Sequence, residues 1–338
     1  MTVSAFICGT SGPTLTADEI AFLRAARPWG FILFKRNCET PEQIRALTAA
    51  LRDIVGRDAP ILIDQEGGRV QRLGPPHWPA YPTGRTYGDV FARSAEDGRR
   101  AAWLGARLMA ADLKALGIDV DCLPVLDVPV EGAHDVIGPR AYGVTPDIVS
   151  DLGRTAAEGL LAGGVLPVIK HIPGHGRAGV DSHHALPVVD TPRAVLEATD
   201  FPPFRDAARL PLAMTAHVVY TSLDPDHPAT TSKTVIDEVI RRLIGFDGCL
   251  MSDDVSMQAL SGTIAERTAA ALAAGCDLAL HCNGVLAEME AVAANTPPLA
   301  GMAADRAARA LAARRRPAPL DEAGARAEFA RLTGMPSV

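Results

Sequence analysis

The chain has 338 residues, of which 48% are hydrophobic and 22% charged, and its formal net charge at pH 7 is −7. This composition is that of an ordinary globular protein and excludes the disordered and fibrous classes. The acidic balance argues against a surface that binds nucleic acid. At about 150 residues per domain the length suggests two domains, but a single (β/α)8 barrel of about 250 residues or more also fits.

Features that the chain lacks predict a cytoplasmic protein. No stretch of about 18 uninterrupted apolar residues could form a membrane span, and the N-terminal segment lacks the basic and apolar regions of a secretory signal peptide. The six cysteines form no Cys-x-x-Cys pair, and most of them lie in or beside apolar runs. We therefore expect buried free thiols in a reducing compartment rather than a disulfide framework.

Short apolar runs alternate with longer helical patterns along the chain. The predicted strands cover residues 3–8, 30–34, 61–64, 120–126, 166–170, 212–217, 249–252 and 278–281. The predicted helices include residues 17–26, 41–54, 99–116, 148–162, 233–243 and 264–274. Most of the strands are nearly continuous apolar runs, as in a parallel sheet that is buried on both faces. Eight such strands, most of them followed by a helical pattern, predict an α/β fold, a single (β/α)8 TIM-type barrel.

A doubly wound open sheet is the alternative fold, but no glycine-rich dinucleotide fingerprint follows an early strand. The composition changes after about residue 297, where proline pairs and a short arginine cluster separate alanine-rich helices. We therefore expect a catalytic barrel over residues 1–296 and a C-terminal helical tail over residues 297–338, packed on the barrel.

In such a barrel, chemistry is expected at the C-terminal ends of the strands and in the loops that follow. The third predicted strand runs directly into Asp64-Gln-Glu-Gly-Gly-Arg-Val-Gln-Arg72. A salt-bridged turn would account for a lone acid. Two acids and two arginines beside glycines that permit close backbone approach favour a ligand site instead.

The fifth predicted strand ends at Lys170, one of only four lysines among the 33 basic residues. The loop that follows holds four of the nine histidines and an acid, namely His171, His175, Asp181, His183 and His184. A single histidine is more often a core or surface residue, but four in one glycine-containing loop indicate a functional loop.

Two further strand ends carry polar residues, and the segment around Arg140 reads as a turn. The seventh strand leads into Asp253, which would face the barrel mouth, and Asp254, which could cap the following helix. The sixth strand ends in His217 at the same rim. Arg140 follows a Gly-Pro pair after the fourth strand, and this pattern alone indicates an ordinary turn with a solvated arginine.

Together these segments resemble the family-three glycoside hydrolases. The matching motifs are Asp64-Gln-Glu-Gly-Gly-Arg-Val-Gln-Arg72, Lys170-His-Ile-Pro-Gly-His-Gly176, Asp181-Ser-His183 and Ser252-Asp-Asp-Val-Ser-Met257. They occur in the right order at separate strand ends, and the resemblance covers about residues 3–295. The chain is most similar to the single-domain bacterial β-N-acetylglucosaminidases of that family. One departure is Ile172, where the family more often has phenylalanine, a change of packing that puts no catalytic role in doubt.

The resemblance implies a retaining enzyme that removes terminal N-acetylglucosamine from peptidoglycan fragments containing 1,6-anhydro-N-acetylmuramic acid, during cell-wall recycling. Asp253 would be the nucleophile and His183 the general acid/base, with Asp181 as its partner. The sugar would be held by five residues, Asp64, Arg72, Arg140, Lys170 and His171. For Arg140, this reverses the interpretation drawn from the turn pattern alone. The partner would be this small-molecule muropeptide substrate, and no cofactor and no metal ion are expected.

The implied chemistry is coherent on physical grounds. Most retaining glycosidases use two carboxyl groups, but a histidine titrates near neutral pH, and a neighbouring carboxylate can orient it and favour its protonated form. Gly174, Gly176 and Gly179 could let the loop swing the acid/base pair over a bound sugar and away again.

Two other functions stay open at this point. The five residues of the histidine-rich loop could supply ligands for a metal-dependent barrel hydrolase. No His-Glu-x-x-His motif is present, and Pro173-Gly174 disfavours a shared helix face for His171 and His175. The second alternative is a non-catalytic glycan-binding or regulatory protein on the same barrel, against which the intact Asp253, Asp181 and His183 argue.

Overall fold

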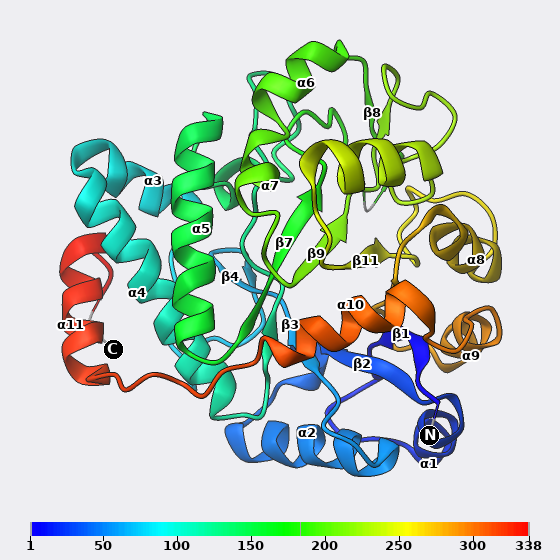
Figure 1. Cartoon of the computed structure of the whole chain (residues 1–338). Helices are drawn as coiled ribbons and strands as arrows, with labels where there is room; N and C mark the ends of the chain where they lie inside the picture. Colours follow the sequence, from blue (N-terminus) through cyan, green and yellow to red (C-terminus); the bar gives the residue numbers. More distant parts are fainter. Residues whose placement is uncertain (1, 183, 337–338) are drawn as a thin grey trace.

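A computed structural model describes residues 2–182 and 184–336 of the chain. Eight parallel strands close into a barrel in the order β1-β12-β11-β9-β7-β6-β3-β2 (Figure 1). These strands are β1 (Ser4–Cys8), β2 (Pro28–Leu33), β3 (Ile61–Ile63), β6 (Val120–Asp121), β7 (Leu166–Ile172), β9 (Leu212–Thr215), β11 (Cys249–Asp254) and β12 (Leu278–His281). Each corresponds to one predicted strand, so the predicted single (β/α)8 barrel is confirmed.

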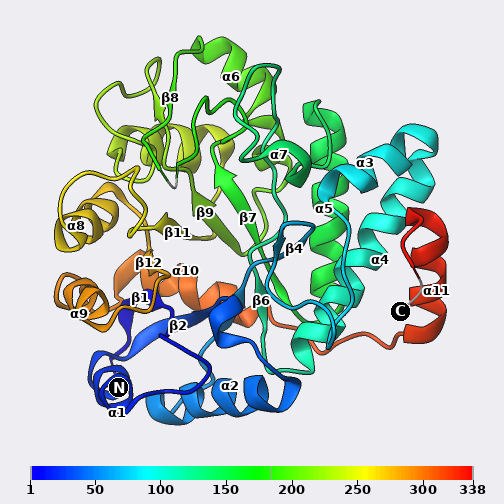
Figure 2. The same cartoon turned by 180° about the vertical axis from the view of Figure 1, so that it is seen from behind.

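Helices surround the barrel, as the two opposite views show (Figures 1 and 2). They are α1 (Ala17–Ala26), α2 (Pro41–Val55), α3 (Gly84–Arg93), α4 (Ala95–Lys114), α5 (Pro146–Ala162), α6 (Arg193–Thr199), α7 (Pro202–Asp206), α8 (Ile264–Ala274), α9 (Leu286–Ala294), α10 (Gly301–Ala312) and α11 (Glu322–Thr333). A π-helix, η3 (Val235–Ile244), and two short 3-10 turns, η1 (Lys35–Asn37) and η2 (Gly138–Arg140), add to them. Two small sheets pair β4 (Gln65–Gly67) with β5 (Val70–Gln71) and β8 (Val188–Val189) with β10 (Val219–Tyr220).

Local sequence signals place several of these helices. At the start of α1, the Thr16 hydroxyl accepts from the Glu19 N–H at 3.2 Å, and the Glu19 carboxylate accepts from the Thr16 N–H at 2.9 Å. This reciprocal capping box satisfies two backbone donors that the first turn leaves without partners. Helix α8 ends at Gly275, whose φ of 119° lies in the region that favours glycine.

The strands are buried on both faces, which explains their continuous apolar runs. Ile7, Ile32 and Val168 belong to one buried cluster, together with alternate residues of the other barrel strands. Their chain neighbours Phe31 and Ile169 belong to clusters formed with residues of the surrounding helices. The side-chain period of two along each strand thus divides the apolar residues between the barrel interior and the helix-covered outside.

Some predicted boundaries are wrong. β6 ends at Asp121 rather than at residue 126, because Pro124 has no N–H to donate and interrupts the regular ladder. Past Asp121 the segment stays beside β7 through irregular backbone hydrogen bonds, in which the Val168 N–H donates to the Leu123 carbonyl at 3.0 Å and the Leu126 N–H donates to the Lys170 carbonyl at 2.7 Å. β9 ends at Thr215, two residues before His217, and α4 begins at Ala95, four residues before its predicted start.

The segment after residue 296 contacts the barrel and its surrounding helices at several points. The Leu299 N–H donates to the Val3 carbonyl at 2.8 Å, beside β1. In α10, Arg306 forms an ion pair with Asp277 at 3.3 Å, and in α11 Arg326 pairs with Asp112 of α4 at 2.8 Å. The division of the chain into domains at residues 296 and 297 stays a prediction.

Two further predictions concern cysteines and membranes. All six cysteines are buried and free, as the apolar context of most of them predicts. Among residues 2–182 and 184–336, no helix is both long enough and apolar enough to span a membrane.

Candidate active site

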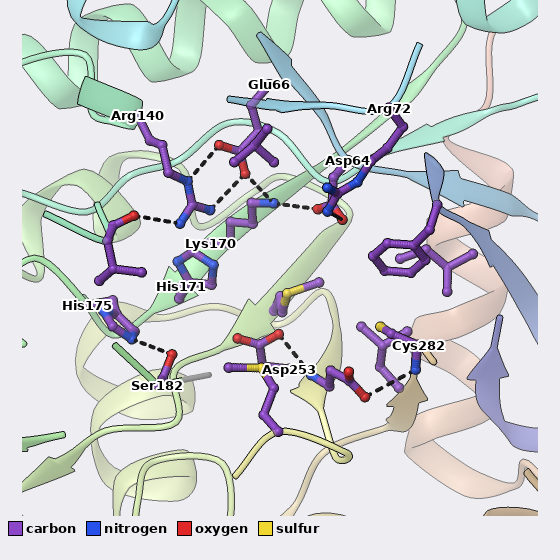
Figure 3. A pocket seen from close by; sticks show the side chains of 18 of the residues that line it. Asp64, Glu66, Arg72, Arg140, Lys170, His171, His175, Ser182, Asp253 and Cys282 are labelled. Carbon is purple, nitrogen blue, oxygen red and sulfur yellow. Dashed lines mark hydrogen bonds and ion pairs between the residues drawn. The ribbon is translucent and has the colours of Figure 1, made fainter. Parts of the chain in front are cut away.

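A cavity of about 390 Å³ opens where the barrel strands end. Its lining includes residues at or just after several strands, among them Asp64, Lys170, His171, Asp253 and Cys282. Figure 3 shows Arg140, Glu66, Lys170 and Asp64 gathered along one side, with the Asp253 carboxylate facing them from the opposite side. The cavity therefore lies at the end of the barrel where the sequence predicts chemistry.

Lys170 is the centre of a buried ionic cluster. The side chain is 2% exposed, and Nζ lies 2.8 Å from Asp64 Oδ1 and 2.7 Å from Glu66 Oε1. Arg72 Nη2 donates to the second Asp64 oxygen at 3.0 Å. Arg140 Nε and Nη2 each donate to one Glu66 oxygen at 2.8 Å, a bidentate pair. Because each buried charge has an opposite charge within hydrogen-bond distance, the cluster offsets the desolvation of its members.

The cluster keeps its carboxylates ionised. Burial raises the pKa of Asp64, but Lys170 and Arg72 outweigh this and hold it well below its ordinary value. Burial likewise raises the pKa of Glu66, and Arg140 and Lys170 bring it down to about 2. Three cations thus surround two carboxylates, which leaves donors directed toward the cavity at neutral pH.

His171 is oriented by Asp127, a residue that the sequence analysis did not select. Asp127 is fully buried; its Oδ2 lies 2.7 Å from His171 Nδ1, and its Oδ1 accepts from the backbone N–H groups of His171 and His175. Burial raises the pKa of Asp127, but His171 brings it down to about 2. The position of Asp127, directly after the predicted fourth strand, could have revealed it.

Asp253 lies at the end of β11 with one carboxylate oxygen engaged. Its Oδ1 accepts from the Asp254 N–H at 2.8 Å, while no residue among 2–182 and 184–336 donates to Oδ2. Burial raises the pKa of Asp253, but His217 and His171 outweigh this effect and lower it, so the group is ionised at neutral pH. An ionised carboxylate therefore faces the ionic cluster across the cavity.

Asp254 does not cap the following helix, as the sequence suggested it could. Its side chain accepts from the Ser256 N–H at 3.0 Å and the Cys282 N–H at 3.1 Å. Helix α8 begins later and is capped by Thr263. Asp254 therefore stabilises the turn after β11 and does not cap the following helix.

The histidine-rich loop is described except for one residue. His183 lies outside the described residues. The Asp181 carbonyl accepts from the His184 N–H at 2.9 Å, and His184 is exposed. Ser182 lines the cavity and its hydroxyl lies 3.1 Å from His175 Nε2 (Figure 3). Burial lowers the pKa of His175 to about 4, so this imidazole is neutral near pH 7.

The turn that carries Arg140 is correctly predicted, but its side chain is not solvated. Arg140 ends η2, and its side chain is only 10% exposed because it pairs with Glu66. The structure therefore brings Asp64, Arg72, Arg140, Lys170 and His171 to one cavity.

Two further residues in the cavity wall were also missed. The guanidinium groups of Arg36 and Arg72 lie 5.1 and 4.9 Å from the centre of the Phe34 ring. Phe34 ends the second predicted strand, so the strand-end rule could have found both it and Arg36. Within the described residues, no group of three or more His, Cys, Asp or Glu side chains could hold a metal ion.

Comparisons with known proteins agree with this arrangement. Residues 16–309 match the model of the glycosyl hydrolase family 3 N-terminal domain. A β-hexosaminidase of Alkalilimnicola ehrlichii is 40% identical over 287 residues, which cover 84% of this chain and 82% of that protein.

Solved structures are similar over nearly the whole chain. The crystal structure of NagZ from Neisseria gonorrhoeae in complex with N-trifluoroacetyl-D-glucosamine has a TM-score of 0.88 and 32% identity, covering 100% of this chain and 99% of that one. A family 3 β-N-acetylglucosaminidase from Paenibacillus has a TM-score of 0.81 and 30% identity, covering 96% of this chain and 61% of that one. The chain therefore belongs to glycosyl hydrolase family 3 and is a glycoside hydrolase.

Proposed function

We propose that this enzyme is a retaining β-N-acetylglucosaminidase that removes terminal N-acetylglucosamine from peptidoglycan fragments, namely N-acetylglucosaminyl-1,6-anhydro-N-acetylmuramic acid and its peptides. The observation that carries the proposal is the ionised Asp253 carboxylate, which faces the Lys170 cluster across a cavity of about 390 Å³. Ligand pockets for small molecules are commonly about 300–1,000 Å³ in volume.

Asp253 acts as the nucleophile in this proposal. One of its carboxylate oxygens attacks the anomeric carbon, a carbon–oxygen bond forms, and the bond to the leaving oxygen breaks. His183, with Asp181 as its partner, gives a proton to that oxygen. In the second step His183 takes a proton from water, the water oxygen bonds to the anomeric carbon, and Asp253 is released. The two displacements together retain the configuration.

The ionic cluster binds the sugar. Sugar hydroxyls and an acetamido carbonyl need both donors and acceptors, and the cluster offers charged donors from Arg72, Arg140 and Lys170 beside the Asp64 carboxylate. His171, oriented by Asp127, adds a ring nitrogen. Because the cations are already held by Asp64 and Glu66, binding costs little reorganisation.

The substrate assignment rests on relatives and on the resemblance of the motifs. Relatives named β-hexosaminidase and β-N-acetylglucosaminidase, and a complex with an N-acylated glucosamine, support an N-acetylglucosamine group at the cleaved end. We place the reaction in cell-wall recycling in the cytoplasm, with residues 1–296 as the catalytic barrel and residues 297–338 as a tail packed on it.

The test is turnover of the defined disaccharide. The purified enzyme is expected to release free N-acetylglucosamine from the anhydro-disaccharide and its peptide-linked forms, and proton NMR should show the β-anomer first. Inversion of configuration would refute the retaining mechanism. Inactivity on these fragments, beside good activity on plain β-glucosides, would refute the substrate. Aryl β-glycosides that differ only at the 2-position provide the matched comparison.

A further inference from the structure

Beside Asp253 lie three buried polar side chains that the proposed reaction does not use. Thr215, His217 and Thr230 are each 0% exposed. Thr215 ends β9 and His217 follows two residues later, whereas Thr230 comes from the segment between β10 and η3. Buried polar groups of this kind are costly unless they are hydrogen-bonded, so their partners indicate what they do.

These side chains form a hydrogen-bonded bridge around the backbone of Asp253. The Asp253 N–H donates to Thr215 Oγ1 at 3.2 Å, and Thr215 Oγ1 lies 2.7 Å from Thr230 Oγ1. Thr230 Oγ1 lies 2.7 Å from His217 Nδ1, and His217 Nε2 lies 3.0 Å from the Asp254 carbonyl oxygen. The bridge therefore runs from the backbone N–H of Asp253 to the backbone carbonyl of Asp254.

The hydrogens along this bridge can be assigned from chemistry. A carbonyl oxygen only accepts, so His217 Nε2 carries a hydrogen, and in a neutral imidazole Nδ1 then accepts. The Thr230 hydroxyl therefore donates to His217, and the Thr215 hydroxyl donates to Thr230. With a protonated imidazole, the Thr230 hydrogen turns to the Ala216 carbonyl, 3.1 Å away, and the bridge persists.

The middle of the bridge is itself anchored. The Ala229 N–H donates to the Val218 carbonyl at 2.8 Å, and the Thr231 N–H donates to the Pro228 carbonyl at 2.9 Å. The Thr230 carbonyl accepts from the Cys276 thiol at 3.7 Å. Thr230 is thus held by its own turn and by two neighbouring segments, and its hydroxyl has a defined place between Thr215 and His217.

We propose that Thr230 is a positioning residue for Asp253, acting through Thr215 and His217. This inference rests on the proposed role of Asp253 as the nucleophile. An attacking oxygen must lie within a few tenths of an ångström of its productive place, and an error of about 1 Å can cost about 100-fold in rate. Loss of the Thr230 hydroxyl leaves His217 Nδ1 and the Thr215 hydroxyl without their shared partner, so the Asp253 backbone is less firmly held.

Thr230→Val is the test, because valine keeps the shape of threonine and removes the hydroxyl. Thr230→Ser restores the hydroxyl. Thr231→Val is the matched control, since among the described residues the Thr231 hydroxyl has no closer partner than the Pro228 carbonyl, 3.5 Å away in the same turn. The readouts are kcat, KM, inhibition by free N-acetylglucosamine, and the rate of covalent labelling by a 5-fluoro N-acetylglucosaminyl fluoride.

For Thr230→Val we expect kcat and the labelling rate to fall by about 10- to 100-fold. KM and inhibition by N-acetylglucosamine should stay within about twofold, because the sugar is bound by other residues. Thr230→Ser and Thr231→Val should behave like the original enzyme. Thr215→Val interrupts the same bridge one bond closer to Asp253 and should give the same pattern, which keeps the test decisive if Thr230→Val does not fold.

The outcomes separate this inference from the proposed function. Labelling of another carboxylate in the unmodified enzyme would refute the role of Asp253 and the inference with it. Labelling of Asp253 at the same rate in the unmodified enzyme and Thr230→Val would overturn the inference and leave the proposed function standing. Equal losses in the affinity for N-acetylglucosamine and in the labelling rate would show that Thr230 supports the cavity as a whole. That result would also overturn the inference.

Discussion

The Glu66→Gln variant removes one negative charge from between Arg140 and Lys170 and keeps the size of the side chain. Glu66 is 5% exposed and accepts two hydrogen bonds from Arg140 besides its ion pair with Lys170. A glutamine offers one carbonyl oxygen, and its NH₂ group turns two donors toward cations that cannot accept them. We expect the folded state to lose stability at neutral pH.

The magnitude follows from the pKa of Glu66. The pKa is lowered from 4.5 to about 2 by the neighbouring cations, despite the opposing effect of burial. Since one pKa unit corresponds to about 1.4 kcal/mol, ionised Glu66 contributes about 3 kcal/mol to the free energy of unfolding. This agrees with the 3–5 kcal/mol, roughly, that removal of one partner from a buried ion pair costs.

The same pKa values determine how the contribution of Glu66 to the free energy of unfolding depends on pH. The folded state binds the Glu66 proton more weakly than the unfolded state, so the contribution is fully present above about pH 4.5 and is lost as the pH falls toward 2. Glutamine does not titrate. The difference in unfolding free energy between the original protein and Glu66→Gln should therefore be constant from pH 7 to pH 5.5 and shrink below pH 4.5.

Urea unfolding at a series of pH values measures this difference. Glu42→Gln is the control, because Glu42 pairs with Arg45 on the surface with its side chain 77% exposed, and little change is expected. A difference between the original protein and Glu66→Gln that is absent at pH 7, or that stays constant down to pH 3, would refute the reasoning.

Four further variants test the chemistry of the site. Asp253→Ala should abolish turnover and leave the circular dichroism spectrum unchanged; residual activity near that of the original enzyme would exclude it as the nucleophile. His183→Ala should lose about 100-fold or more on substrates with poor leaving groups and much less on activated aryl glycosides, with the same trend for Asp181→Ala. Equal losses on both substrate types would contradict an acid/base role. Asp127→Asn weakens a charge-assisted bond of about 1.5–3 kcal/mol to His171 and should raise KM about tenfold. An unchanged KM in turnover assays would show that His171 needs no such partner.

Much of the fold is predictable from the sequence because its signals are local. A strand that is buried on both faces needs an apolar residue at nearly every position, and such runs are visible along the chain. Capping residues such as Thr16 with Glu19 mark helix starts directly. The end of β6 was not predictable in this way, because Leu123 and Val125 are apolar whether or not the backbone around Pro124 stays in the sheet.

The candidate site is predictable in part for a related reason. Parallel strands bring all their C-terminal ends to one rim. Polar residues at those ends, such as Asp64, Lys170 and Asp253, must therefore gather there. Residues on long connections escape this rule. The Gly-Pro pattern before Arg140 correctly indicates a turn, but it holds no information on Glu66, which lies 74 residues away along the chain.

The sequence by itself determined the barrel, the end of the barrel that carries the chemistry, and most of the ionic side chains found there, because these depend on local burial patterns and on the geometry of parallel strands. Only the tertiary structure decided which charges pair, that Asp127 orients His171, and that Thr230 links Thr215 to His217 beside Asp253. Such partners come from different strands and loops, and their meeting depends on how those loops fold back over the barrel mouth, which no local pattern encodes.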